Sequence, residues 1–99
     1  MSSAKKPAGK HTERREFVVI NKLGIHARPA ALFVKAANRH ACNILVEKDG
    51  EQVNGKSIMG LMMLAAGPGT KLTIICDGED CQQALDEIAA LIQRKFDED

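Results

Sequence analysis

Residues 23–30 read Leu-Gly-Ile-His-Ala-Arg-Pro-Ala and mark the start of a helix just after a glycine. Apolar side chains recur at helical spacing over residues 27–38, at Ala30, Ala31, Val34 and Ala37. Pro29 near the start of this segment removes no helical hydrogen bond, because the first amides of a helix have no partner within it. The stretch therefore predicts a helix that begins beside His26.

Short apolar runs on both sides of this helix predict four strands, over residues 17–20, 44–48, 52–54 and 72–76. Asp49-Gly50 separates the second run from the third and favours the positive φ angles of a tight hairpin. Ser57 precedes an apolar segment, residues 58–64, which predicts a short helix with a serine N-cap. Gly67-Pro68-Gly69 ends that helix.

The last segment predicts the longest helix. It opens at Asp80, with Gln83 three residues later, a pattern similar to a capping box. Its apolar residues fall on one face, at Ala84, Leu85, Ile88, Ile92 and Phe96. The order βαββαβα predicts an α+β sandwich with a largely antiparallel sheet and helices on one face.

Charge is distributed unevenly along the 99 residues. Five of the 14 basic and two of the 13 acidic residues lie within residues 1–16, so residues 17–99 carry a net charge of −2 although the whole chain carries +1. We predict that residues 1–15 form a flexible basic tail and that residues 16–99 form a single domain. A nearly neutral body with three Phe and no Trp or Tyr argues against nucleic-acid binding by the folded part.

The three cysteines and the hydropathy pattern narrow the class of protein further. Cys42, Cys76 and Cys81 lack CxxC spacing, so we expect small buried hydrophobes rather than disulfides or a zinc site. No apolar run approaches the ~20 residues of a membrane span, and the N-terminus lacks the apolar core of a signal peptide. We predict a cytoplasmic protein that is monomeric and not inserted in a membrane.

His26 is the candidate nucleophile. The start of a helix offers N–H groups without partners and a partial positive charge, and both attract anions. Arg28 adds a planar donor fork that suits phosphate oxygens. The positive surroundings also disfavour the imidazolium, which keeps the ring nucleophilic. His11 and His40 have the ordinary interpretation of surface histidines, with His40 after the end of the first helix, where a cation is favourable.

Two segments together carry a resemblance to a known family. Residues 24–30, Gly-Ile-His-Ala-Arg-Pro-Ala, and residues 54–60, Asn-Gly-Lys-Ser-Ile-Met-Gly, resemble the signature segments of HPr, the histidine phosphocarrier of the phosphoenolpyruvate-dependent phosphotransferase system. The resemblance spans residues 16–99 and implies an open-faced sandwich with a four-stranded sheet and three helices. It further implies that enzyme I phosphorylates Nδ1 of His26, that Arg28 clamps the phosphate, and that an enzyme II A component receives it. No cofactor or metal is required.

The resemblance also implies a regulatory site and a docking surface. Ser57 corresponds to the serine that HPr kinase/phosphorylase modifies, and Ile58, Met59 and Met62 correspond to the partner-docking face. A helix of about two turns cannot bury all of its apolar residues in any case. Residues 21–24 and 96–99 resemble the nitrogen-branch paralogue, whereas residues 56–62 resemble the kinase-regulated form, so the branch stays open. The alternative function is a regulatory binding module that keeps the fold.

A nucleotide hydrolase is the remaining alternative, because residues 50–57, Gly-Glu-Gln-Val-Asn-Gly-Lys-Ser, satisfy the Walker A pattern. Residues 72–77 also mimic a Walker B strand. A Walker A loop must lead from a strand into a helix of a parallel sheet, whereas Asp49-Gly50 predicts a hairpin at this place. The pattern therefore argues only weakly for nucleotide hydrolysis.

Overall fold

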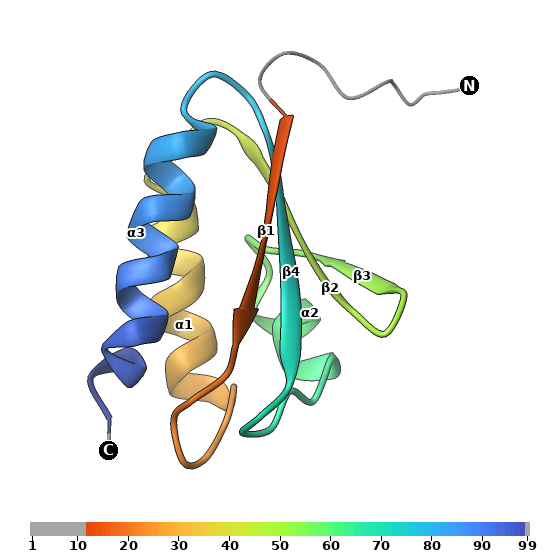
Figure 1. The fold of residues 1–99 in the computed structure, drawn as a ribbon, viewed down its shortest axis with the longest axis vertical. Coiled ribbons are helices and arrows are strands. Elements are labelled where there is room, and N and C mark those ends of the chain that lie inside the picture. Colours follow the sequence, from red (N-terminus) through yellow and green to blue (C-terminus); the bar gives the residue numbers. More distant parts are fainter. Residues whose placement is uncertain (1–11, 99) are drawn as a thin grey trace.

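The computed structural model describes residues 12–98, which form one antiparallel sheet with helices on one of its faces (Figure 1). The strands are β1 (Thr12–Val18), β2 (Asn43–Lys48), β3 (Glu51–Asn54) and β4 (Lys71–Asp77). The helices are α1 (Ala27–Ala37), α2 (Ile58–Met63) and α3 (Cys81–Gln93), followed by a single 3-10 turn, η1 (Lys95–Asp97). The predicted βαββαβα order and open-faced sandwich are confirmed.

The sheet has the strand order β1-β4-β2-β3, and every neighbouring pair is antiparallel. Side chains alternate along β2 and β4, so that Ile44, Val46, Ile74 and Cys76 are buried under the helices. The predicted hairpin joins β2 to β3, with Asp49 and Gly50 both at positive φ. Helices α1 and α3 lie side by side against the sheet, and α2 lies beside α1 (Figure 1).

The first strand begins earlier than predicted. β1 starts at Thr12 and therefore includes four residues that the sequence assigned to the basic tail, while Val19 and Ile20 lie beyond its end. β1 is an edge strand that pairs only with β4 within the described sheet, and charged side chains are common on such edges. Its hydrogen bonds to β4 hold it in place without an apolar run. The remainder of the predicted tail, residues 1–11, lies outside the described residues.

The C-terminal helix also ends earlier than predicted. α3 stops at Gln93, so Phe96 is not on its apolar face. Lys95, Phe96 and Asp97 all have positive φ, and this left-handed turn folds Phe96 back into the core, where it is 1% exposed. The capping box is wrong as well, because Asp80 makes no side-chain cap on α3. Its carboxylate instead accepts hydrogen bonds from the backbone N–H of Ala41 and Cys42, at 2.8 and 3.0 Å.

None of the helices within residues 12–98 is long and apolar enough to cross a membrane. Cys42, Cys76 and Cys81 are buried thiols, as predicted.

Candidate functional site

His26 is the N-cap of α1, at the end of a turn that is fixed by a close backbone approach. Gly24 has φ +73°, and a Cβ at this position would lie 2.5 Å from the carbonyl oxygen of Ala66. The next amide, that of Ile25, donates to the same carbonyl at 2.8 Å. The carbonyl of His26 accepts the first helical hydrogen bond from Ala30, at 2.9 Å. The turn therefore presents the histidine at the helix N-terminus, with its side chain 39% exposed.

A carboxylate from the far end of the chain reaches the histidine ring. The Nε2 atom of His26 lies 2.9 Å from Oε2 of Glu98, whose side chain is only 12% exposed. The left-handed turn at residues 95–97 places Glu98 there, because it reverses the chain after α3. Buried Asn21 donates from Nδ2 both to the other oxygen of Glu98, at 3.1 Å, and to the carbonyl of Gly24, at 2.7 Å. Asn21 thus joins the glycine turn to the carboxylate.

Arg28 lies on the first turn of α1, with its side chain 64% exposed. Its Nη1 atom is 3.9 Å from the same Glu98 oxygen that contacts His26. A surface pocket beside these groups is lined by Lys22, Leu23, Arg28, Asp97 and Glu98. The structure therefore brings His26 and Arg28 to one place, beside an exposed pocket that carries two cationic side chains.

The sequence predicts a positive helix terminus and Arg28 around His26, and the structure adds the carboxylate of Glu98 at hydrogen-bond distance from Nε2. A carboxylate at one ring nitrogen favours the tautomer that has the proton on that nitrogen. Nδ1 then keeps its lone pair. The helix terminus and Glu98 therefore act on the ring in different ways, the first attracting an anion and the second orienting the imidazole.

Helix α2 carries the predicted serine cap and an exposed apolar surface. Ser57 is its N-cap, and its Oγ accepts a hydrogen bond from the amide of Gly60 at 3.0 Å, which confirms the capping assignment. Only Leu61 of α2 is buried. The exposed apolar side chains are Ile58, Met59, Met62 and Met63. This α2 surface includes all three predicted docking residues and adds Met63.

The other described histidine, His40, has a structural role between two helices. It follows the end of α1, as predicted, and its Nε2 lies 2.8 Å from Oε1 of Glu87 on α3, while Arg39 forms an ion pair with the other oxygen. The hydrogen bond from Arg39 is the main reason that the pKa of Glu87 lies below its usual value; burial opposes this effect, and a weaker hydrogen bond from His40 adds to it. His40 therefore links α1 to α3 and lies among acidic and basic partners.

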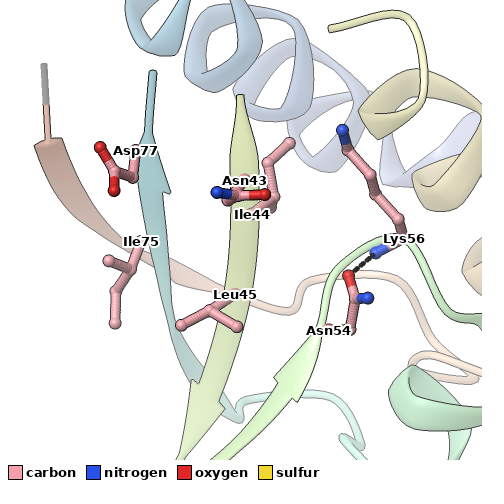
Figure 2. A pocket seen from close by; sticks show the side chains of 7 residues that line it. All are labelled: Asn43, Ile44, Leu45, Asn54, Lys56, Ile75 and Asp77. Atoms are coloured by element: carbon pink, nitrogen blue, oxygen red, sulfur yellow. Dashed lines mark hydrogen bonds between the residues drawn. The ribbon is translucent and has the colours of Figure 1, made fainter. Parts of the chain in front are cut away.

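The Walker A pattern corresponds to no phosphate-binding loop. Its residues form β3 and the turn after it, and β2 lies between β3 and the Walker B-like strand β4. Lys56 donates from Nζ to the carbonyl of His40 at 2.8 Å, and its amide donates to Oδ1 of Asn54 at 2.8 Å (Figure 2). The pocket beside these residues opens on the helix-free face of the sheet and is lined partly by Leu45 and Ile75 (Figure 2). The Lys56 side chain therefore connects this turn to the segment that follows α1.

Three residues of the site were not predicted from the sequence. Asn21 and Glu98 appeared only as parts of segments that suggested a branch of the family, and Leu23 was not given a role. Glu98 is 72 residues from His26, so no local pattern connects the two. Leu23 is 70% exposed and lines the pocket beside Arg28, and a large exposed apolar residue before a helix start was the available signal.

Comparison with known proteins agrees with this geometry. The family model for the PTS HPr component phosphorylation site matches residues 13–94. The HPr-like protein Crh of Bacillus subtilis is 55% identical over 74 residues, which cover 75% of this chain and 87% of that protein. The phosphocarrier protein HPr of Pseudomonas aeruginosa is 50% identical over 84 residues, 84% of this chain and 93% of that protein.

Solved structures show the same fold. The crystal structure of HPr-C-His from Thermoanaerobacter tengcongensis superposes with a TM-score of 0.85 at 41% identity, covering 88% of this chain and 98% of that chain. The phosphocarrier protein HPr of Bacillus anthracis gives 0.78 at 48% identity, over 82% of this chain and 96% of that chain. With the family model matching most of the chain, the conclusion is direct: the chain belongs to the HPr family of phosphocarrier proteins of the phosphotransferase system.

Proposed function

We propose that this protein accepts a phosphoryl group from phosphorylated enzyme I on Nδ1 of His26 and passes it to an enzyme II A component. The observation that carries the proposal is the position of His26, at the N-terminus of α1 with Nε2 held by Glu98 at 2.9 Å. This arrangement supports one nitrogen as the nucleophile and offers an anion site next to it. Membership in the HPr family supports the direction of the chemistry.

The transfer follows from the orientation of the ring. The proton stays on Nε2 and is shared with Glu98, while the lone pair of Nδ1 attacks the phosphorus in line with the phosphorus–nitrogen bond of the donor. That bond breaks as the new one forms, so no proton has to leave the ring during attack. In the onward transfer, the acceptor attacks the phosphorus and the Nδ1–phosphorus bond breaks. The imidazole of His26 then leaves as a neutral ring, because its proton stays on Nε2 beside Glu98. Glu98 and Asn21 act here as positioning residues.

The phosphate is held by groups that the structure places around the helix start. The amides of the first turn of α1 and the positive end of its dipole attract the anion. Arg28 is exposed and only loosely paired with Glu98, at 3.9 Å, so its guanidinium is able to turn toward phosphate oxygens. Lys22 adds a second cation at the edge of the same pocket. Positioning and charge suffice for such a transfer, and no metal or cofactor takes part in the proposal.

The donor and the acceptor dock on the apolar surface near this site. Ile58, Met59 and Met62 are 41%, 71% and 42% exposed. Unbranched methionine side chains adapt to differently shaped partners, which a carrier between unlike proteins requires. We expect Leu23 to extend this surface on the other side of Arg28. The relay operates in the cytoplasm, and we expect the carrier to act as a monomer, although three related structures are described as dimers.

The test is incubation of the full chain with enzyme I and labelled phosphoenolpyruvate. The wild type should gain an acid-labile, base-stable label that an enzyme II A component removes. His26→Ala should abolish the label, whereas the matched variant His40→Ala should keep it, because His40 lies between α1 and α3. Transfer to enzyme II A proteins of the sugar and nitrogen branches, compared side by side, assigns the branch. Unchanged labelling of His26→Ala would refute the proposal.

A second function, regulation through Ser57, is favoured by the 55% identity to Crh, whose structure is described as that of a catabolite repression protein. Ser57 Oγ lies at the start of α2, beside the docking residues, so a phosphate there would place negative charge on the docking surface. We expect HPr kinase/phosphorylase to phosphorylate wild type but not Ser57→Ala, and Ser57→Asp to slow phosphorylation of His26. A regulatory module without carrier activity would instead show the first result and no transfer from His26.

A further inference from the structure

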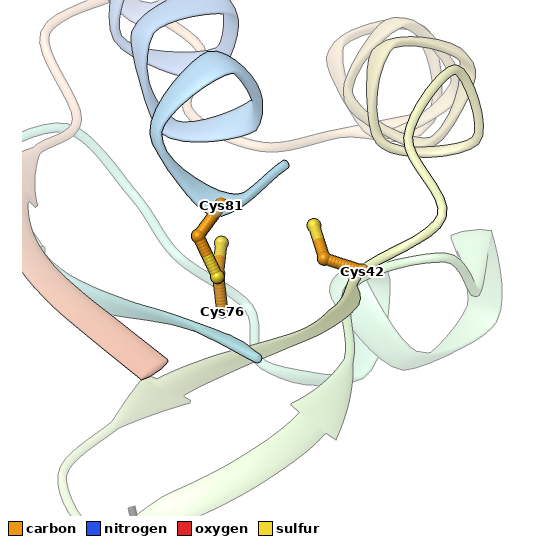
Figure 3. Close-up of side chains that lie close together, drawn as sticks. All are labelled: Cys42, Cys76 and Cys81. Atoms are coloured by element: carbon orange, nitrogen blue, oxygen red, sulfur yellow. The ribbon is translucent and has the colours of Figure 1, made fainter. Parts of the chain in front are cut away.

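The three cysteines of the chain meet at one place in the core. Cys42 precedes β2, Cys76 lies near the end of β4 and Cys81 is the first residue of α3 (Figure 3). Their sulfur atoms all lie within 4.8 Å of one another. Each residue is at most 2% exposed. Three sulfur donors from three separate elements therefore share one buried volume.

The fold holds this cluster together at close quarters. Gly78, in the turn between β4 and α3, lies so near to Cys42 that a Cβ on the glycine would be 2.6 Å from the cysteine Cβ. On the other side, the carboxylate of Asp80 accepts hydrogen bonds from the backbone N–H of Ala41 and Cys42. The loop that carries Cys42 is thereby fixed against the turn that leads to Cys81. The donor set is preorganised, which lowers the cost of binding.

The number and type of donors select the ligand. Thiol sulfur is a soft donor, which selects Cu(I), zinc or iron–sulfur clusters rather than hard cations. A metal at about 2.3 Å from three sulfurs in a plane would set them about 4.0 Å apart, inside the observed limit. Structural zinc takes four ligands, whereas the group found within residues 12–98 consists of these three thiols. We propose that Cys42, Cys76 and Cys81 form a buried three-sulfur site that binds one Cu(I) ion.

Charge and access are compatible with such an ion. Burial raises the pKa of Cys42 to about 11 and that of Cys76 to about 12, so the metal-free core contains neutral thiols. Binding forms copper–sulfur bonds and releases the thiol protons to solvent, with no change of copper oxidation state. Helix α3 begins at Cys81, so the positive end of its dipole offsets part of the negative charge of the thiolates that bind copper. A surface pocket beside Cys42 is lined by the acidic residues Asp77, Glu79 and Asp80, whose carboxylates attract cations.

The test uses the full chain, reduced and kept free of oxygen, with Cu(I) delivered in competition with a chromophoric Cu(I) chelator. One ion per chain should bind, and X-ray absorption should show three sulfur neighbours at about 2.3 Å. The surface methionines are a second source of sulfur, so the variant Met59→Leu/Met62→Leu/Met63→Leu is the matched control and should bind as the wild type does.

Variants of the cluster complete the design. Cys42→Ala and Cys76→Val should each weaken Cu(I) binding by more than about a hundredfold, a larger loss than that of an outer-shell partner, while circular dichroism shows the fold retained. If a variant does not fold, the number of sulfur neighbours that X-ray absorption finds around copper in the wild type tests the proposal instead. A site with four ligands, a site with fewer than three sulfurs, or binding lost in the methionine variant would overturn the proposal. Failure of Cu(I) to bind would overturn it as well and would leave phosphoryl transfer by His26 untouched.

Discussion

Replacing Gly24 with alanine tests how the structure positions His26, and Gly50 offers a matched control. Both glycines have positive φ, +73° and +84°. A Cβ at Gly50 would meet nothing within 4 Å, whereas one at Gly24 would lie 2.5 Å from the carbonyl oxygen of Ala66 and 2.8 Å from the Cα of Gly67. The two substitutions share the backbone strain and differ in the steric contact.

The expected magnitudes follow from these two terms. Left-handed backbone with a Cβ costs about 1–2 kcal/mol, and the stiffer unfolded chain returns about 0.4–1 kcal/mol, so Gly50→Ala should destabilise by about 0–1.6 kcal/mol. Gly24→Ala must also separate two backbone segments by several tenths of an ångström, which adds about 1–3 kcal/mol of overpacking. Its total destabilisation should therefore be about 1–4.6 kcal/mol. The displaced turn should move His26 away from Glu98.

Urea unfolding followed by circular dichroism measures the free energies, and the rate of phosphorylation by enzyme I measures the site. Gly24→Ala should lower the midpoint by about 1 M urea or more relative to Gly50→Ala, at an unchanged m value. It should also slow phosphorylation of His26, whereas Gly50→Ala should not. Equal losses of stability in the two variants, or normal phosphorylation of Gly24→Ala, would refute the argument that the approach to Ala66 sets the site.

Three further substitutions test other contacts. Ser57→Ala removes the cap on the amide of Gly60 and should cost about 1 kcal/mol in urea unfolding, while Ser57→Thr should recover most of it. Arg39 and His40 lower the pKa of Glu87 in the folded state, so the stability that Glu87 adds is present above its ordinary pKa and is lost as the pH falls through the folded value. Glu87→Gln should therefore cost about 1 kcal/mol at pH 7 and should make the loss of stability in acid less steep. Equal slopes of stability against pH in the two proteins would contradict this. Phe96→Ala should cost about 3–5 kcal/mol and free the ring of His26 from Glu98, seen as a loss of their contact in NMR, whereas an unchanged stability would mean that the left-handed turn does not depend on burial.

Local patterns predicted most of the fold, because the deciding residues are close in sequence. The helical spacing after Pro29, the Asp49-Gly50 turn and the serine before residue 58 each fix a short segment through its own backbone preferences. β1 was partly missed, since an edge strand is held by hydrogen bonds to β4 and shows little apolar alternation. Asp80 was misassigned because its carboxylate binds backbone amides 38 and 39 residues away, a contact that no local pattern encodes.

The candidate site likewise contains residues that a local pattern predicts and a residue that only the completed fold brings there. His26 and Arg28 lie in one short segment whose chemistry is visible in the sequence, so both were predicted together. Glu98 reaches His26 only because Phe96 anchors a left-handed turn in the core, and this combination of strain and burial depends on the completed fold. The sequence therefore predicted His26 as the candidate nucleophile, while the structure added Glu98 beside its ring.

We propose that Nδ1 of His26 carries the phosphoryl group while Nε2 keeps its proton beside Glu98. Long-range proton–nitrogen NMR of the ¹⁵N-histidine-labelled protein, recorded before and after phosphorylation by enzyme I and phosphoenolpyruvate, distinguishes the two ring nitrogens directly. We predict that the signal of Nδ1 in His26 alone shows the coupling and shift of a phosphorylated nitrogen, with His40 unchanged. A phosphate on Nε2 of His26, or on any other histidine, would contradict it.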